Sequence, residues 1–213
     1  MTRKIPTLPP TPTAVARQFQ GRRADSARRE ALLDALLVLV LEQGFSAITM
    51  DTFASHARCS KTTIYTLGVD KEQLVATLYR RFFREATATI EERIAPIATE
   101  RERIATYLDA IGSHMSRMSN ACYIDMTQHD ATLEIYGTNA RVSAERVRLF
   151  IERGISTGEF GGTNAHFIGE AVWLLIEGIH HGVLLDRTHL TSGQAYREIS
   201  ELVLKALTNT ART

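Results

Sequence analysis

Residues 48–65, ITMDTFASHARCSKTTIY, read as two short helices joined by a tight turn. Thr49 and Ser60 each stand where an N-cap residue precedes a helix. Phe53 falls on the apolar face of the first helix, and Ile64 is the clearly apolar residue of the second. This pattern is typical of a helix-turn-helix, whose second helix lies in the major groove of DNA. An ordinary pair of surface helices is the alternative.

The second helix is too short and too polar to be stable by its own propensity, so we expect its exposed face to contact a partner. Lysine and threonine side chains suit phosphates and base edges, and a tyrosine hydroxyl can donate to a phosphate. For the major groove and the adjacent DNA backbone we predict Lys61, Thr62, Thr63 and Tyr65. For other phosphates we predict Thr49, Ser60, Thr66 and Lys71.

A further helix is predicted to begin after Asp70, a good N-cap, with Gln73 at the reciprocal position of a capping box. Lys71 is poorly placed in the first turn of that helix, because the helix dipole favours anions there. A phosphate near this N-terminus would remove the conflict.

Together these residues resemble the tetracycline-repressor (TetR) family of transcriptional regulators. The motifs that carry the resemblance are Gly44-Phe45, Thr49, Ala57-Arg58-Cys59-Ser60, Thr63-Ile64-Tyr65 and Lys71-Glu72-Gln73-Leu74. The resemblance covers about residues 26–76, and several of the motif spacings agree at once. The resemblance implies a DNA-binding head, a helical body, and a homodimer that presents two recognition helices to double-stranded operator DNA.

The chain departs from the family pattern at two places. Arg58 stands where the family has a turn glycine, which implies backbone strain if φ is positive there. Residues 66–68, Thr-Leu-Gly, stand where the family has aromatic and histidine residues that contact phosphates. Thr66 can replace one of these contacts, and Gly68 replaces none.

The composition suits a protein of one or two domains, since 213 residues with 44% hydrophobic content can bury a sizeable core. Residues 1–61 carry nine Lys and Arg against five Asp and Glu, although the formal net charge of the chain is +1. A basic N-terminal third fits DNA contact. The two cysteines, Cys59 and Cys122, fit neither a disulfide framework nor a zinc cluster. With no visible signal peptide or membrane-spanning run, we expect a cytoplasmic protein without a membrane partner.

Helical periodicity without an alternating strand pattern predicts an all-α chain of two domains behind an N-terminal arm. Residues 1–25, which contain four prolines and the arginines at 17, 22 and 23, are expected to form a flexible basic arm that can enter the minor groove. Residues 26–70 are expected to form the helix-turn-helix DNA-binding domain, whose first helix, from Ser26, ends at Gly44. Residues 71–213 are expected to form the ligand-binding and dimerisation domain, with helices near 71–94, 98–118, 122–133, 138–156, 164–185 and 191–208.

The last two predicted helices are the most hydrophobic of the C-terminal half. The first carries apolar residues on more than one face, and the second carries an apolar stripe. A helix that is apolar on two sides must be buried twice, once in its own core and once against a partner. This favours a symmetric homodimer with a four-helix interface, which the TetR resemblance also implies. A larger monomeric bundle is the alternative.

The resemblance further implies a cavity in the body, where a small effector of unknown identity changes the spacing of the two DNA heads. Aromatic and methionine side chains with a few polar groups suit such a pocket, although they are also ordinary core residues. The candidates are Tyr107, His114, Met115, Met118, Tyr123, Met126, Trp173, Glu177 and His180. The function expected is that of a repressor released from its operator by a small, largely apolar effector.

Enzyme activity has little support in the sequence. Glu177 and His180 form an E-x-x-H pair, but a di-metal site needs a second pair and two more glutamates. Nucleophile-elbow, phosphate-loop and zinc-protease motifs are missing, so we expect no catalysis, no cofactor and no metal. A helical-bundle metal enzyme and an effector-independent architectural DNA-binding dimer are the alternatives. Only a small-molecule-dependent change in DNA affinity separates the latter from a regulator.

Overall fold

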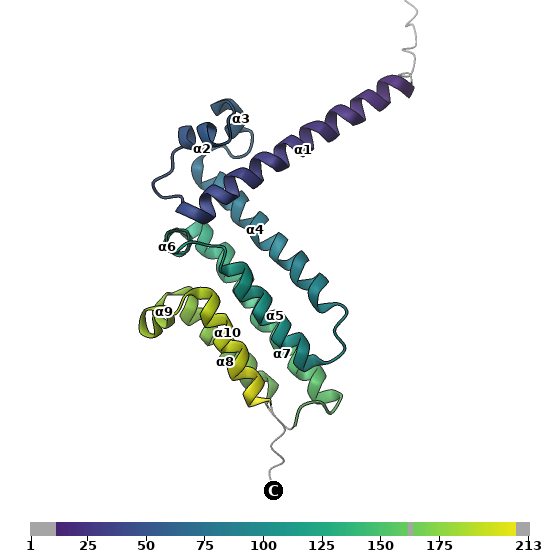
Figure 1. Cartoon of the computed structure of the whole chain (residues 1–213), viewed down its shortest axis with the longest axis vertical. Coiled ribbons are helices and arrows are strands. Elements are labelled where there is room, and N and C mark those ends of the chain that lie inside the picture. The colour runs from purple at the N-terminus through teal and green to yellow at the C-terminus, as the bar shows by residue number, and fades with distance from the viewer. Residues whose placement is uncertain (1–11, 162–163, 208–213) are drawn as a thin grey trace, which may run out of the picture.

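The computed structural model describes the backbone of residues 12–161 and 164–207, and the side chains of residues 25–161, 164–179 and 181–207. Within this part of the chain all regular structure is helical, which confirms the predicted all-α class (Figure 1). The helices are α1 Pro12–Gln43, α2 Met50–His56, α3 Lys61–Tyr65, α4 Lys71–Ile94, α5 Glu100–Met115, α6 Asn120–Gln128, α7 Asp130–Ser156, α8 Ala165–His180, α9 Val183–Thr188 and α10 Ser192–Ala206.

The head consists of the C-terminal half of α1 with α2 and α3, packed on the start of α4 (Figure 1). Its core contains Leu36 and Val40 from α1, Phe53 from α2, Ile64 from α3 and Leu74 from α4, all 0% exposed. Burial of an aliphatic or phenylalanine side chain contributes about 1.5–3 kcal/mol. This shared core fixes the position of α3, although that helix is only five residues long.

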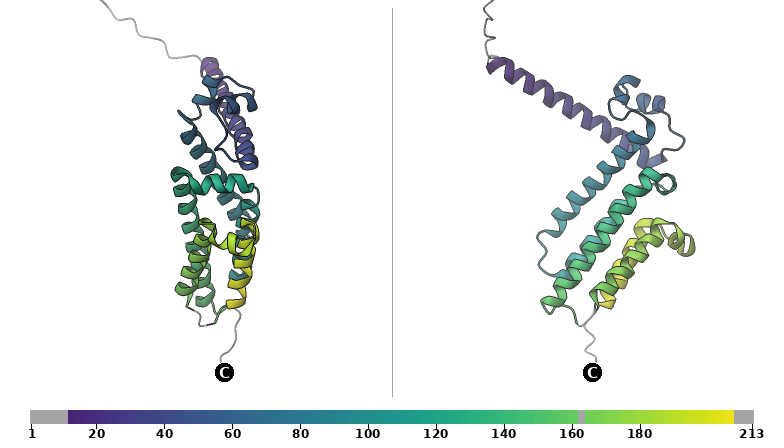
Figure 2. Two further views of the ribbon diagram at one scale, coloured as in Figure 1. Left: turned by 90° about the vertical axis from the view of Figure 1, so that its left-hand side faces the viewer. Right: turned by 180° about the vertical axis from the view of Figure 1, so that it is seen from behind.

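The body is a bundle in which α4, α5, α7, α8 and α10 run along one another (Figure 2). α6 lies across the end of this bundle that faces the head and contacts both α1 and α7. α4 belongs to both parts, because its first turns lie under the head and the rest packs against α5 and α7. The head is therefore connected to the body through α4 and α6.

The predicted start of the first helix is wrong. α1 begins at Pro12 rather than Ser26, so residues 12–25 are helical and not the flexible arm that their composition suggested. Proline suits the first helical position, because its missing N–H would be unpaired there in any case. The alanine, glutamine and arginine residues that follow it favour helix. Residues 1–11 of the predicted arm, and the side chains of its three arginines, lie outside the described residues.

Two boundaries in the body also differ from the prediction. The helix expected over residues 164–185 is two helices, because Gly182 has a φ of 74° and separates α8 from the short α9. The break expected between residues 133 and 138 lies at His129, whose backbone is extended (φ −114°, ψ 123°). The Thr132 hydroxyl donates to the Met126 carbonyl oxygen across this junction at 2.8 Å.

α8 buries one face and exposes apolar side chains on another, as the sequence predicted, and α10 also exposes an apolar side chain. In α8, Val172 and Ile176 are buried, whereas Phe167 and Leu174 are 70% and 64% exposed. In α10, Leu202 is 56% exposed. Apolar side chains this exposed on neighbouring helices are a candidate contact surface.

None of the described helices combines the length and the hydropathy that a membrane span requires. Within the same residues, His, Cys, Asp and Glu side chains do not gather in threes that could hold a metal ion.

Candidate nucleic-acid interface

Side-chain caps begin both helices of the helix-turn-helix. Thr49 Oγ1 accepts a hydrogen bond from the Thr52 N–H at 3.1 Å, and Ser60 Oγ accepts one from the Thr63 N–H at 3.1 Å. Both N-caps predicted from the sequence are therefore confirmed, and each stabilises its helix by about 1 kcal/mol. The same two hydroxyls lie 2.9 Å from those of Thr52 and Thr63. The phosphate contacts of Thr49 and Ser60 stay predictions.

The turn between α2 and α3 has the left-handed backbone that the glycine of the family pattern would provide. Arg58 adopts a φ of 50° there, and the Cys59 N–H closes the turn on the Ala54 carbonyl oxygen at 3.0 Å. A non-glycine residue in this region carries a strain of about 1–2 kcal/mol. The Arg58 side chain is exposed at this turn, two residues before Ser60, the N-cap of α3.

α3 turns a polar face outward. Lys61 and Thr62 are exposed, Tyr65 is 43% exposed, and Thr63 is half-buried. Ile64 points into the head core and is 0% exposed. The face opposite Ile64 is thus free to enter a groove.

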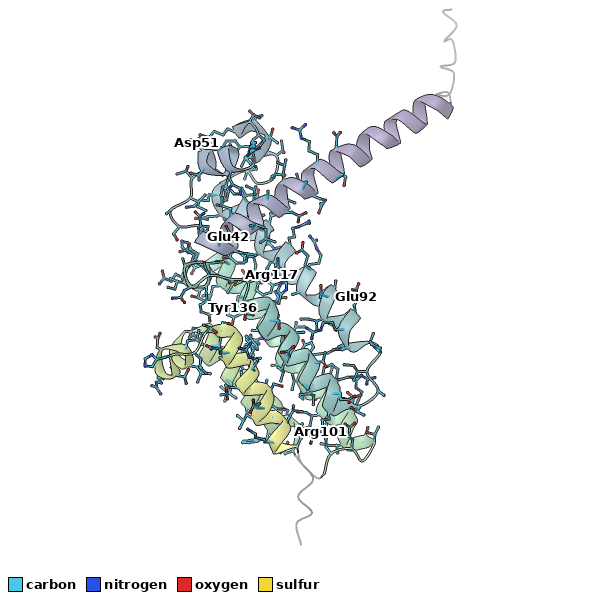
Figure 3. The ribbon with its side chains drawn as sticks, in the orientation of Figure 1. Glu42, Asp51, Glu92, Arg101, Arg117 and Tyr136 are labelled. Carbon is cyan, nitrogen blue, oxygen red and sulfur yellow. The ribbon has the colours of Figure 1, made fainter. Side chains whose placement is uncertain are left out.

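Lys61 forms an ion pair with Asp51 of α2, with 2.9 Å between Nζ and Oδ1. The hydrogen bond from Lys61 to Asp51 and the charge of that carboxylate raise the pKa of Lys61 above its ordinary value. Asp51 lies at the outer end of the head, away from the body (Figure 3). Because exposed ion pairs contribute little to stability, a phosphate can replace Asp51 at small cost.

Thr66, predicted to contact phosphate, terminates α3. Its hydroxyl donates to the Thr63 carbonyl oxygen at 2.6 Å, and its own carbonyl oxygen accepts from Arg29 Nη1 at 2.8 Å. The second bond ties the end of α3 to α1. Thr66 therefore has a structural role besides the contact predicted for it.

Lys71 also has a role within the protein that the sequence did not indicate. Its half-buried ammonium donates to the carbonyl oxygens of Phe45, at 3.1 Å, and Ser46, at 2.9 Å. These two carbonyl oxygens offset its unfavourable place at the start of α4. The phosphate contact of Lys71 stays a prediction, and it would compete with these two bonds.

A carboxylate of the body binds the N–H groups of the same loop of the head. Asp125, in α6, accepts hydrogen bonds from the N–H groups of Phe45 (2.5 Å) and Ser46 (2.7 Å) and from the Ser46 hydroxyl (2.5 Å). Burial alone would raise the pKa of Asp125, but these bonds outweigh it and hold the pKa below its ordinary value. Gly44 has the predicted positive φ, 75°, and a Cβ there would lie 2.4 Å from Asp125 Oδ2.

The structure brings together three of the nine candidate ligand-binding residues. Tyr107, His114 and Met115 line a cavity of about 150 Å³ between α4, α5 and α7. Met118 and Tyr123 line a separate, open groove between the α5–α6 junction and the α9–α10 junction.

The remaining candidates are scattered. Met126 is 0% exposed core. The Arg141 guanidinium lies over the Trp173 ring, with its carbon 4.9 Å from the ring centre, and Trp173 lines a hollow between α7 and α8. Glu177 is half-buried on α8, and the side chain of His180 lies outside the described residues.

Sequence reasoning missed the charged part of the cavity wall. Glu91 of α4 and Arg146 of α7 form an ion pair there, with 2.7 Å between Oε2 and Nη2. In the sequence each residue looks like a solvent-exposed charge on an amphipathic helix. Because the two positions are 55 residues apart, no local spacing indicates that they pair.

Comparisons with known proteins agree with this architecture. The chain is 27% identical over 146 residues to the uncharacterized HTH-type transcriptional regulator YdeS of Bacillus subtilis (strain 168), a match that covers 66% of this chain and 71% of YdeS. No protein-family model matches the sequence.

Solved structures share the fold over most of the chain. A proposed transcriptional regulator of Saccharomonospora viridis in complex with choline superposes with a TM-score of 0.67 at 17% identity, covering 84% of this chain and 96% of that one. A TetR-family transcriptional regulator of Cytophaga hutchinsonii gives a TM-score of 0.64 at 15% identity, covering 85% and 95%. With its helix-turn-helix head and all-helical body, this chain has the fold of the TetR-family transcriptional regulators.

Proposed function

We propose that this protein is a DNA-binding transcriptional repressor that reads its operator with α3. The observation that carries the proposal is the exposed polar face of α3, with Lys61, Thr62 and Tyr65 opposite the buried Ile64. The N-caps, the head core and the hydrogen bond from Arg29 hold this face rigidly, so little conformational entropy is lost on binding. The similarity to helix-turn-helix regulators supports the same function.

The proposed active form is a homodimer through α8 and α10. The exposed Phe167, Leu174 and Leu202 give these two helices the apolar surface that a four-helix interface needs. A twofold axis between them would present two α3 helices to successive major grooves, about 34–36 Å apart.

The N-terminal part of α1 is proposed to follow the DNA backbone beside the head. Figure 1 shows it projecting away from the body, and its sequence contains Arg17, Arg22 and Arg23. Deletion of residues 2–24 should therefore weaken specific and scrambled DNA alike and reduce the salt dependence of binding.

Release from the operator is proposed to follow binding of a small effector in the cavity between α4, α5 and α7. α4 runs from this cavity wall to the underside of the head, so its position affects both. The structural neighbour from Saccharomonospora viridis was solved in complex with choline, which supports small-molecule binding by proteins of this fold. An effector acts only if it binds one arrangement of the two heads better than the other.

The proposed function is tested by fluorescence anisotropy of the protein on DNA from directly upstream of its own gene, with a scrambled duplex as control. A preference of about 10³ or more is expected of a sequence-reading regulator. Equal binding to both duplexes that falls steeply with salt would instead indicate an architectural DNA-binding protein. Absence of binding to either duplex at low salt would refute the proposal.

A further inference from the structure

The cavity between α4, α5 and α7 has a size that restricts its ligand. Its volume is about 150 Å³, and its apolar walls include Phe83, Ile90, Ile111 and Met115. A dry apolar cavity of about this volume accommodates benzene, whereas pockets for drug-sized ligands are about 300–1,000 Å³. A single six-membered ring with a small substituent therefore fills the space.

The wall of the cavity favours an aromatic ring. Tyr107, Tyr136 and Tyr196 contribute three further rings, and Met115 contributes a thioether. Aromatic rings pack edge-to-face on one another, and methionine sulfur packs favourably at ring edges. A benzene ring gains these contacts, which an alkyl chain of the same volume does not.

Arg146, a residue of the cavity wall, has a buried N–H donor without a hydrogen-bond partner in the described part of the chain. Arg146 uses Nη2 to bind Glu91, and its guanidinium carbon lies 5.3 Å from the Phe150 ring centre. Arg146 Nε is buried and has no hydrogen-bond partner within the described part of the chain. A buried N–H of this kind favours any ligand that brings an acceptor, because the donor is otherwise left unsatisfied.

The charges around the cavity cancel. Arg146 and Glu91 neutralise one another in its wall, where their side chains are 36% and 46% exposed. Burial and the nearby Arg117 lower the pKa of His114 to about 4, so this side chain is neutral at pH 7. Burial raises the pKa of Tyr107 and that of Tyr136, and it raises that of Tyr196 to about 12, so the phenols are neutral as well. A charged ligand would lose its hydration in this largely apolar cavity without a net opposite charge to compensate for it.

We propose that this cavity binds a neutral, single-ring aromatic molecule whose one oxygen acceptor takes the hydrogen bond of Arg146 Nε. The inference rests on the proposed function only in treating this cavity as the effector site. It names the chemical class of that effector, an uncharged benzene derivative with a carbonyl or hydroxyl oxygen.

The test uses four ligands that share a ring and one exocyclic carbon: benzamide, benzoate, benzylamine and toluene. Their dissociation constants are measured by ligand-observed NMR on the full chain without DNA. Benzamide is expected to bind most tightly. Toluene, which lacks the acceptor, and the two charged ligands are each expected to bind about tenfold more weakly.

Variants assign the binding to this cavity. Arg146→Met should weaken benzamide about tenfold and leave toluene unchanged, because only benzamide uses the Nε donor. Arg148→Met is the matched control, since Arg148 lies on the same helix but pairs with Glu145 and Glu152 outside the cavity. Ala86→Leu should fill the space and abolish binding of all four ligands. Thr87→Leu, at the exposed rim, replaces it if circular dichroism shows that Ala86→Leu does not fold.

Tighter binding of benzoate, benzylamine or toluene than of benzamide would overturn the proposal. So would equal loss of benzamide affinity in Arg146→Met and Arg148→Met, or the failure of all four ligands to bind. The operator assay separates this result from the proposed function. If the protein binds benzamide but neither DNA duplex, only the proposed regulator function is refuted. If it binds the operator but does not prefer benzamide, only this inference is refuted.

Discussion

Replacement of Asp125 by alanine should lower the free energy of unfolding by about 2 kcal/mol. The carboxylate accepts three hydrogen bonds from the loop after α1, and bonds to a charged group contribute about 1.5–3 kcal/mol each when they are buried. Ser46 is exposed, so water replaces the carboxylate at its two donors and little is lost there. Phe45 is 2% exposed, so water cannot easily reach its N–H, and most of the loss of about 2 kcal/mol comes from leaving this buried donor without an acceptor.

The measurement is urea unfolding followed by circular dichroism, at one protein concentration because dimerisation would make stability depend on it. In thermal melts, 2 kcal/mol corresponds to a lower Tm by about 4–8 °C for a chain of this length. Asp125→Asn should lose less, since one amide oxygen can still accept from both N–H groups. Glu134→Ala is the control, because Glu134 is an exposed acidic residue of α7.

The stabilisation by Asp125 should also depend on pH. The pKa of Asp125 is lowered in the folded protein, so its contribution is complete above the pKa of an unfolded aspartate, about 3.9, and is lost as the pH falls through the folded value. The difference between the wild type and Asp125→Ala should therefore be constant near neutral pH and shrink below pH of about 4. Equal unfolding free energies of the two proteins at pH 7 would refute the reasoning.

Four further predictions concern DNA binding, stability and assembly. Tyr65→Ala should weaken operator binding in the anisotropy assay, while circular dichroism and light scattering show unchanged helicity and dimer. Lys71→Ala should lower the free energy of unfolding by about 1 kcal/mol, because two carbonyl groups lose their donor. If Lys71 also contacts a phosphate, the slope of log affinity against log salt concentration should become flatter by about 0.9. The pKa of His114 is lowered to about 4 in the folded protein, so between pH 4 and the unfolded value of about 6.5 the unfolded state binds more protons and stability should fall as the pH falls. His114→Gln should remove this pH dependence in urea unfolding measured at several pH values. Leu174→Glu should yield a monomer by light scattering, whereas Val69→Glu, at a side chain 69% exposed in the head, should not.

The helix-turn-helix was predictable because its physics is local. Thr49 and Ser60 cap helices that begin one residue later, and Gly44 takes the positive φ expected at the end of a helix. Arg58 shows that the same turn geometry forms without the glycine. These features depend on residues three or four apart, which a sequence displays directly.

The features that the sequence did not reveal join distant positions. Asp125 meets the loop after α1 across 79 and 80 residues, and Glu91 meets Arg146 across 55. Charged residues on amphipathic helices have many possible partners, and only the packing of the bundle selects one. The start of α1 was missed for another reason, since Pro12 suits both a disordered segment and the first turn of a helix.

The close fit of Gly44 against Asp125 constrains how this sequence can diverge. A side chain at position 44 would meet both an unfavourable backbone and the carboxylate oxygen 2.4 Å away, so replacement of Gly44 stays costly even after Asp125 has changed. Variants with a side chain at position 44 are destabilised, and selection against poorly folded proteins removes them. In an alignment of orthologues, the column that corresponds to position 44 should therefore stay glycine, whereas position 125 can change to a residue that still accepts hydrogen bonds from the loop, such as asparagine.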